Sequence, residues 1–307
     1  MSQSASRLSG LIAAPYTPLH QDGSLNLPMI DKLAGSLVSN GVTGAFVCGT
    51  TGEGVSLTND ERMQVAERWQ EVAGEKLRVI VHVGHTSAVD ARSLAAHAEK
   101  IGAWGVGCLA PFFFKPGNAE DLAAFCAEVA AGAPGLPFYY YQIPSMTGVS
   151  LSAADFLRAA APRIPNLAGV KFTFENLMDF AECQRLDGGR YDIVFGRDEI
   201  LVAGLAIGAR GAIGSTYNFM APIFHEIIAA FDKGDLSTAR EKQAAANAII
   251  QIFIRHGGLP VGKAMMKMIG LDCGPVRLPL RTLSDTQQAQ LRKELETAGF
   301  FQLCSRG

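Results

Sequence analysis

Eight short apolar runs alternate along the chain with segments of helical spacing, and this alternation restricts the possible folds more than any other feature. The runs lie at residues 11–15, 45–49, 79–84, 106–110, 138–142, 168–173, 192–196 and 212–215. Most are continuously apolar, which is typical of parallel strands covered on both faces. Eight successive strand–helix units predict an α/β fold, a (β/α)8 TIM barrel. A doubly wound open sheet is the alternative, but its glycine-rich phosphate turn is missing.

The pattern changes after residue 215, where the β-forming runs end. Helical spacing continues over residues 222–233, 237–256, 262–269 and 284–298. Pro275 and Pro279 interrupt the chain before the last of these segments. We therefore expect a barrel catalytic domain over residues 1–225 and a C-terminal helical extension over residues 226–307, without a flexible linker between them.

Charge and composition exclude several classes of partner. The chain has 27 basic and 29 acidic residues with no long run of either sign, so we expect neither a nucleic-acid nor a membrane partner. It has no apolar span of transmembrane length, and residues 1–9 lack the apolar core of a signal peptide. Its six cysteines form no CxxC pair and its six histidines no HxxxH pair. These features predict a cytoplasmic protein with reduced thiols and no metal site.

One lysine lies inside an apolar run. Lys171 belongs to the segment Leu-Ala-Gly-Val-Lys-Phe-Thr at residues 167–173, where strand alternation places Gly169, Lys171 and Thr173 on one face. Burial lowers the pKa of a lysine, and a neutral amine can form a Schiff base with a carbonyl substrate. Most strand lysines instead lie at an edge and reach water. The catalytic interpretation of Lys171 therefore depends on what the other strand ends carry.

Two neighbouring strand ends carry groups that suit such chemistry. The second strand leads into Gly-Thr-Thr-Gly-Glu-Gly at residues 49–54, where backbone amides and the hydroxyls of Thr50 and Thr51 can bind a carboxylate. An ordinary glycine-rich turn is the alternative interpretation. The fifth strand ends in three tyrosines, of which Tyr141 is expected to transfer protons and Tyr140 to pack under the helices.

The last three strand ends carry hydroxyls and carboxylates. Thr173, Gly196, Asp198, Glu199 and Ser215 are predicted to bind a polyhydroxylated substrate. Asp198 could instead cap the helix that follows it. Because functional groups of a TIM barrel gather at the carboxyl ends of its strands, these residues are expected to converge around Lys171. None of them requires a phosphate, a nucleotide or a metal, so we expect no cofactor.

Four motifs in register resemble one known family. Residues 49–53, 141–144, 169–171 and 211–215 together resemble the class I pyruvate-dependent aldolases of the dihydrodipicolinate synthase and N-acetylneuraminate lyase superfamily. The resemblance extends into the tail and so covers nearly the whole chain. It implies a Schiff base on Lys171, proton transfer by Tyr141, small-molecule substrates and a homotetramer.

Details of the motifs are similar to the sialic acid lyase branch. That branch has a tyrosine-rich fifth strand and a Gly-x-Asp-Glu pattern, seen here at residues 139–148 and 196–199. Dihydrodipicolinate synthases usually carry an arginine where Met146 stands. This chain also departs from some relatives at residues 112–114, which are phenylalanines where those relatives have a tyrosine. The branch implies reversible cleavage of N-acetylneuraminate, a sialic acid, to pyruvate and N-acetylmannosamine. Alternatives are 4-hydroxy-tetrahydrodipicolinate synthesis, cleavage of a 2-keto-3-deoxy sugar acid, and a non-catalytic sugar-acid sensor.

Overall fold

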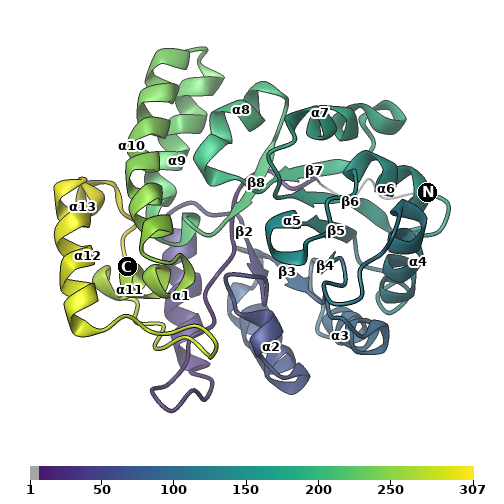
Figure 1. Cartoon of the computed structure of the whole chain (residues 1–307), viewed down its shortest axis with the longest axis horizontal. Helices are drawn as coiled ribbons and strands as arrows, with labels where there is room; N and C mark the ends of the chain where they lie inside the picture. Colours follow the sequence, from purple (N-terminus) through teal and green to yellow (C-terminus); the bar gives the residue numbers. More distant parts are fainter. Residues whose placement is uncertain (1–6) are drawn as a thin grey trace.

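The structure is a closed barrel of eight parallel strands surrounded by helices (Figure 1). It is a computed structural model that describes residues 7–307, so residues 1–6 of the predicted 1–225 domain lie outside it. Each strand pairs with the next one along the chain, and β8 closes the barrel against β1. The strands are β1 Gly10–Ala13, β2 Gly44–Val47, β3 Arg78–His82, β4 Gly105–Leu109, β5 Phe138–Gln142, β6 Leu167–Phe172, β7 Asp192–Phe195 and β8 Gly211–Gly214. The TIM barrel predicted from the sequence is confirmed.

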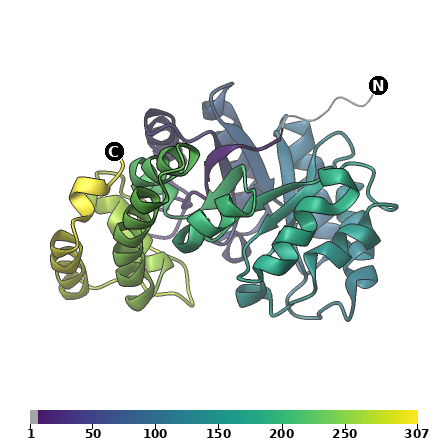
Figure 2. The same ribbon diagram turned by 90° about the horizontal axis from the view of Figure 1, so that it is seen from above.

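Helices and short 3-10 turns connect the strands and cover the barrel (Figure 2). They are α1 Pro28–Ser39, η1 Gly54–Ser56, α2 Asn59–Ala73, α3 Ala88–Lys100, α4 Ala119–Ala130, α5 Pro144–Thr147, α6 Ala153–Ala160, α7 Leu177–Arg185, η2 Leu186–Gly189, η3 Asp198–Ile200 and α8 Leu201–Ala206. Thr58 caps α2 in a capping box with Glu61, and Ser152 caps α6 by accepting from the Asp155 backbone amide. Both caps follow from a hydroxyl residue placed three positions before an acidic one.

The strands separate two apolar cores. Outward-facing residues of β6, among them Val170 and Phe172, pack in the core between barrel and helices. Inward-facing residues, including Phe46, Tyr139 and Tyr141, form a smaller core inside the barrel. Since side chains alternate along a strand, this places Lys171 in the interior, beside Tyr141 in the register of β5 and β6. Tyr140 faces outward and packs on Phe156, as predicted.

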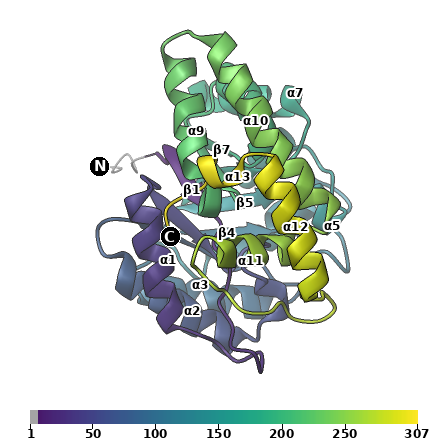
Figure 3. The same cartoon turned by 90° about the vertical axis from the view of Figure 1, so that its left-hand side faces the viewer.

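The C-terminal helices gather on one side of the barrel (Figure 3). They are α9 Tyr217–Asp232, α10 Leu236–Arg255, α11 Leu259–Met268, α12 Asp285–Thr297 and α13 Phe300–Leu303. Helix α9 begins before Pro222 and is kinked at Met220, and residue 225 lies within it. The division between residues 1–225 and 226–307 therefore stays a prediction. At the chain end the Ser305 amide donates to Phe219 O at 2.7 Å, which attaches the extension to α9.

The described residues also bear on the predicted environment. All six cysteines are free, and five of them are buried. Among residues 7–307 no helix is both long enough and apolar enough to cross a membrane. Over the same residues no group of three or more histidine, cysteine, aspartate or glutamate side chains is placed to hold a metal ion.

Candidate active site

A cavity of about 250 Å³ opens at the carboxyl ends of the strands. Residues from the ends of β2, β5, β6, β7 and β8 line it, because the parallel strands all present their carboxyl ends at the same mouth. All nine residues predicted from the sequence are in its wall: Thr50, Thr51, Tyr141, Lys171, Thr173, Gly196, Asp198, Glu199 and Ser215. The convergence expected around Lys171 is therefore present in the structure, while the role of each residue stays a prediction.

Lys171 extends from β6 into the barrel and is only 3% exposed. Its Nζ lies 3.9 Å from the ring centroid of Phe46 and 3.9 Å from that of Tyr141. Burial lowers the pKa of Lys171 to about 7, and the carboxylate of Asp198 partly opposes this change. The environment thus keeps a substantial neutral fraction of the amine near neutral pH, which is the form that attacks a carbonyl carbon.

Tyr141 lies next to this amine with its hydroxyl directed to the second strand end. Its Oη is 3.3 Å from Thr50 Oγ1, and its ring packs edge-on against Phe46 and His82. Burial raises the pKa of Tyr141 to about 12, an effect that the Thr50 hydroxyl reduces. The phenol therefore keeps its proton at neutral pH and can donate it or pass it along the contact with Thr50.

The turn after β2 is held in a tight, unusual conformation. Cys48 and Glu53 both have left-handed backbones, with φ of 57° and 55°. The amides of Glu53 and Gly54 donate back to Thr50 O and Gly49 O, each at 3.1 Å. A side chain at Gly54 would place its Cβ 1.9 Å from Cys48 O, so the turn requires glycine there. This geometry brings Thr50 and Thr51 to the cavity wall.

Asp198 is anchored by the eighth strand end and caps no helix. Its Oδ2 accepts hydrogen bonds from the backbone amide of Thr216 at 3.1 Å and from its Oγ1 at 2.6 Å. Burial raises the pKa of Asp198 to about 6, and both bonds from Thr216 lower it. A Cβ at Gly214 would come within 1.9 Å of Asp198 Oδ1, so glycine on β8 leaves room for the carboxylate. The capping alternative for Asp198 is wrong.

Glu199 and Gly196 complete the wall above the seventh strand. Glu199 forms an ion pair with Arg197 at 2.9 Å, and Arg197 also pairs with Glu175. Gly196 provides space for Thr173, since a Cβ at that position would lie 2.1 Å from Thr173 Oγ1. Glycine at position 196 therefore leaves room for the Thr173 side chain, and Glu199 forms part of the cavity wall.

Sequence reasoning missed the side chains that hold this wall from other elements. From α10, Gln243 donates to Asp198 O at 3.1 Å and Asn247 to Glu199 O at 2.9 Å. Phe46 and His82 on β2 and β3 were missed as neighbours of the lysine and tyrosine. Strand alternation is a signal that could have placed Phe46 inside the barrel. No local signal marks Gln243 or Asn247, because both lie in an ordinary helix.

A second cavity of about 590 Å³ adjoins the first and shares Thr50, Thr51 and Ser215 with it. Its lining is mainly apolar and includes Met146 and Phe112. Met146 thus offers this cavity a thioether and no positive charge.

The pKa of Lys171 predicts how the first chemical step depends on pH. The amine is mostly protonated below pH 7, so the rate of Schiff-base formation should rise about tenfold per pH unit up to that value and then level off. Quenching with cyanoborohydride at timed intervals, from pH 5.5 to 9, measures this rate. A rate that still rises about tenfold per pH unit at pH 9 would mean that the amine has an ordinary lysine pKa.

The fold and the site define a TIM barrel with a buried lysine of lowered pKa at its mouth. The sequence profile of the dihydrodipicolinate synthetase family matches residues 7–298. The chain is 42% identical over 299 residues to N-acetylneuraminate lyase of Mus musculus, covering 96% of this chain and 93% of that protein. The chain belongs to the dihydrodipicolinate synthetase family.

Two solved structures resemble the whole chain closely. N-acetylneuraminate lyase of Proteus mirabilis aligns with a TM-score of 0.94 at 44% identity, covering 96% of this chain and 100% of that one. N-acetylneuraminate lyase, or sialic acid aldolase, of Aliivibrio salmonicida aligns with a TM-score of 0.93 at 42% identity, covering 96% and 98%. The barrel and its helical extension are thus similar to those of sialic acid aldolases from end to end.

Proposed function

We propose that this protein is an aldolase that reversibly cleaves N-acetylneuraminate to pyruvate and N-acetylmannosamine through a Schiff base on Lys171. The observation that carries the proposal is the buried Lys171 amine, with its pKa lowered to about 7, in a cavity lined by hydroxyls and carboxylates. The relatives named above supply the substrate, since each bears the name N-acetylneuraminate lyase.

In the proposed reaction, neutral Lys171 attacks the C2 ketone of the open-chain sugar acid. Tyr141 protonates the carbinolamine oxygen, water leaves, and an iminium forms at C2. The turn carrying Thr50 and Thr51 holds the substrate carboxylate through hydroxyls and backbone amides. The contact between Tyr141 Oη and Thr50 Oγ1 supports this arrangement, because it joins the proton carrier to the carboxylate-binding turn.

The iminium then accepts the electrons of the breaking carbon–carbon bond. The C3–C4 bond breaks as the C4 hydroxyl gives its proton to the Tyr141 phenolate, which releases N-acetylmannosamine as an aldehyde and leaves a pyruvate enamine on Lys171. Protonation at C3 and hydrolysis of the iminium free pyruvate and restore the amine. Thr173, Gly196, Asp198, Glu199 and Ser215 bind the substrate hydroxyls along the cavity wall, and no metal or organic cofactor takes part.

The chief alternative is synthesis of 4-hydroxy-tetrahydrodipicolinate. That reaction joins pyruvate to aspartate semialdehyde and handles a second carboxylate, for which an arginine near the cavity would be suited. Met146 occupies the corresponding position here and is 62% exposed beside the larger cavity. A thioether cannot pair with a carboxylate, so this residue favours the sugar acid as substrate.

A paired assay tests the choice of substrate. Incubation with N-acetylneuraminate should release pyruvate, detected through lactate dehydrogenase, with kcat/KM of at least about 10⁴ M⁻¹s⁻¹, the lower end of the usual range for enzymes. Pyruvate with aspartate semialdehyde should give a rate at least about a hundredfold lower, since a missing charge partner costs several kcal/mol. The reverse order of the two rates would assign the protein to the synthase reaction. Binding of the sugar acid without cleavage would make it a sensor.

We also propose that the protein acts in the cytoplasm as a homotetramer. The exposed aromatic side chains of Phe113 and Phe114, with Phe112 at the edge of the larger cavity, support a subunit contact at this loop. The near-balanced charge and the free, buried cysteines are in keeping with a reducing compartment.

A further inference from the structure

The carboxylate-binding turn is fixed at both ends by side chains from other parts of the fold. Cys48, just before the turn, and Glu53, within it, have left-handed backbones, which non-glycine residues adopt only where the surroundings hold them. At the first end His82 Nδ1 lies 3.0 Å from Cys48 O. In the middle, Thr17 donates from Oγ1 to Gly52 O at 2.6 Å.

At the second end the holding groups come from the helical extension. Glu53 is 4% exposed, and its Oε1 forms an ion pair with Lys263 Nζ at 2.7 Å. Its Oε2 accepts from the backbone amide of Arg277 at 2.8 Å. Lys263 is itself buried at 4% exposure, and it donates to Pro275 O at 2.6 Å. Both oxygens of a buried carboxylate are thus engaged by one segment more than two hundred residues away.

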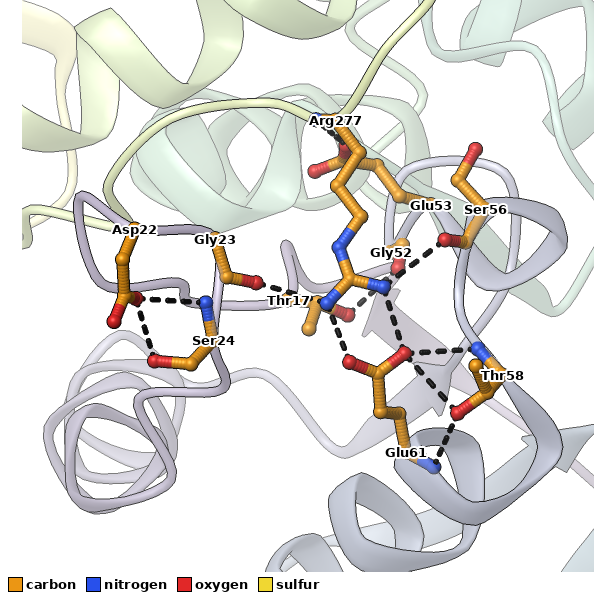
Figure 4. Close-up of polar contacts among 10 residues, drawn as sticks. All are labelled: Thr17, Asp22, Gly23, Ser24, Gly52, Glu53, Ser56, Thr58, Glu61 and Arg277. Atoms are coloured by element: carbon orange, nitrogen blue, oxygen red, sulfur yellow. Dashed lines mark hydrogen bonds and ion pairs between the residues drawn. The ribbon is translucent and has the colours of Figure 1, made fainter.

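The same segment is also tied to the start of α2 (Figure 4). The guanidinium of Arg277 pairs with the Glu61 carboxylate, at 2.7 Å from Nη1 to Oε2, and donates to Ser56 O at 3.1 Å and to Gly23 O at 2.8 Å. Glu61 is the partner of Thr58 in the capping box of α2. Arg277 therefore connects the extension to Ser56 and Glu61, which follow the turn, and to Gly23, which precedes it in the chain.

The buried charges of Glu53 and Lys263 indicate what this network does. Burial lowers the pKa of Lys263, and the carboxylate of Glu53 opposes this by favouring the ammonium. A buried ion pair contributes little net stability over a well-packed apolar pair, so stability alone gives weak reason for it. None of Glu53, Lys263 and Arg277 lines the cavity that contains Lys171, and of the three only Glu53 lines the larger cavity beside it. Lys263 and the Arg277 amide reach the turn through the Glu53 carboxylate, and Thr50 and Thr51 of the same turn line the cavity.

We propose that Glu53 and Lys263 are positioning residues for recognition of the substrate carboxylate, which makes the helical extension part of the binding site. The ion pair and the Arg277 amide hold Glu53 in its left-handed conformation. This aims the hydroxyls and amides of Thr50 and Thr51 at the acid group. The inference depends on the proposed function, because it assigns the turn the role given to it there.

The test compares two lysines on the same helix. Lys263→Met removes the buried ammonium, whereas Lys267→Met removes one that lies a turn further along α11 in an exposed pair with Asp272. Trapping with borohydride measures Schiff-base formation from pyruvate and from acetone, a ketone without a carboxylate. Lys263→Met should raise the half-saturating pyruvate concentration at least about tenfold, since small displacements of binding groups cost up to ~10²-fold. Trapping of acetone by Lys263→Met should remain near the wild-type level. Trapping of both ketones by Lys267→Met should also remain near the wild-type level.

Hydrogen exchange supplies a readout that needs no catalysis. Amides of residues 48–54 should exchange faster in Lys263→Met than in the wild type or Lys267→Met, while those of β6 should not. If Lys263→Met does not fold, Glu53→Gln/Lys263→Met leaves no unpaired buried charge and should show the same selective loss. Wild-type protein that gives no adduct would refute the proposed function. Unchanged exchange at residues 48–54, or equal losses with pyruvate and acetone, would refute the positioning role.

Discussion

Lys171→Ala is expected to abolish both the pyruvate adduct and turnover, with a fall in kcat on the order of 10⁵ or more, as for removal of other covalent nucleophiles. The reason is that the amine supplies the only covalent link between protein and substrate in the proposed reaction. Borohydride reduction in the presence of pyruvate, followed by peptide mass analysis, should locate the adduct on the peptide containing Lys171 in the wild type. A pyruvyl adduct of unchanged yield in the variant would place the Schiff base on another lysine.

Lys171→Met separates the chemical role from the structural one. The folded protein lowers the pKa of Lys171 from its ordinary value to about 7, so below that pH it must bury a charged amine that the unfolded chain leaves in water. Methionine fills similar space without that cost, and we expect the free energy of unfolding at pH 6 to rise by about 1–4 kcal/mol. Urea unfolding measures this. Loss of stability together with loss of activity would mean that the amine also supports the fold.

Tyr141→Phe should retain the fold and lower kcat by about 10²–10⁴, the usual contribution of a positioned acid–base group. The variant loses the hydroxyl 3.3 Å from Thr50 Oγ1 and keeps the ring that packs on Phe46. The adduct should still form with pyruvate, more slowly, because the nucleophile is intact. Steady-state kinetics and timed trapping measure the two effects separately.

Tyr140→Phe is the matched control for this change. Tyr140 is adjacent in sequence and equally buried, but it faces the helices, where its ring packs on Phe156 at a centroid distance of 4.4 Å. Its hydroxyl has no hydrogen-bond partner among the described residues, so removing it should leave both rate and stability near wild type. Similar rates for Tyr141→Phe and wild type would exclude Tyr141 as the proton carrier.

Much of the fold was predictable because its signals are local. Each strand is a short apolar run, and each predicted run overlaps an observed strand. Alternation along β6 placed Lys171 with Gly169 and opposite Phe172, since successive strand residues point to opposite faces. The nine site residues were found together because parallel strands in a barrel share one mouth. Helix α13 and the true start of α9 were missed, as short helices and kinked ends carry weak periodicity.

The contacts that tune the site were not predictable in the same way. The partners of Glu53 are 210 and 224 positions away in the chain, and no pattern near residue 53 indicates them. The same holds for Gln243, which holds the loop of Asp198 from α10. For Asp198 itself the sequence permitted a cap or a site residue; the hydrogen bond from Thr216 rules out the cap, and a role in binding stays a prediction.

The sequence by itself determined the barrel, the face on which Lys171 lies and the set of polar residues at the strand ends. These depend on periodicities of two and of about 3.6 residues, which any local window contains. Only the tertiary structure decided how far the pKa of Lys171 falls, which rings lie against its amine, and what holds the turn after β2. Those properties arise from desolvation and from contacts across the chain, and both exist only after distant segments have packed together.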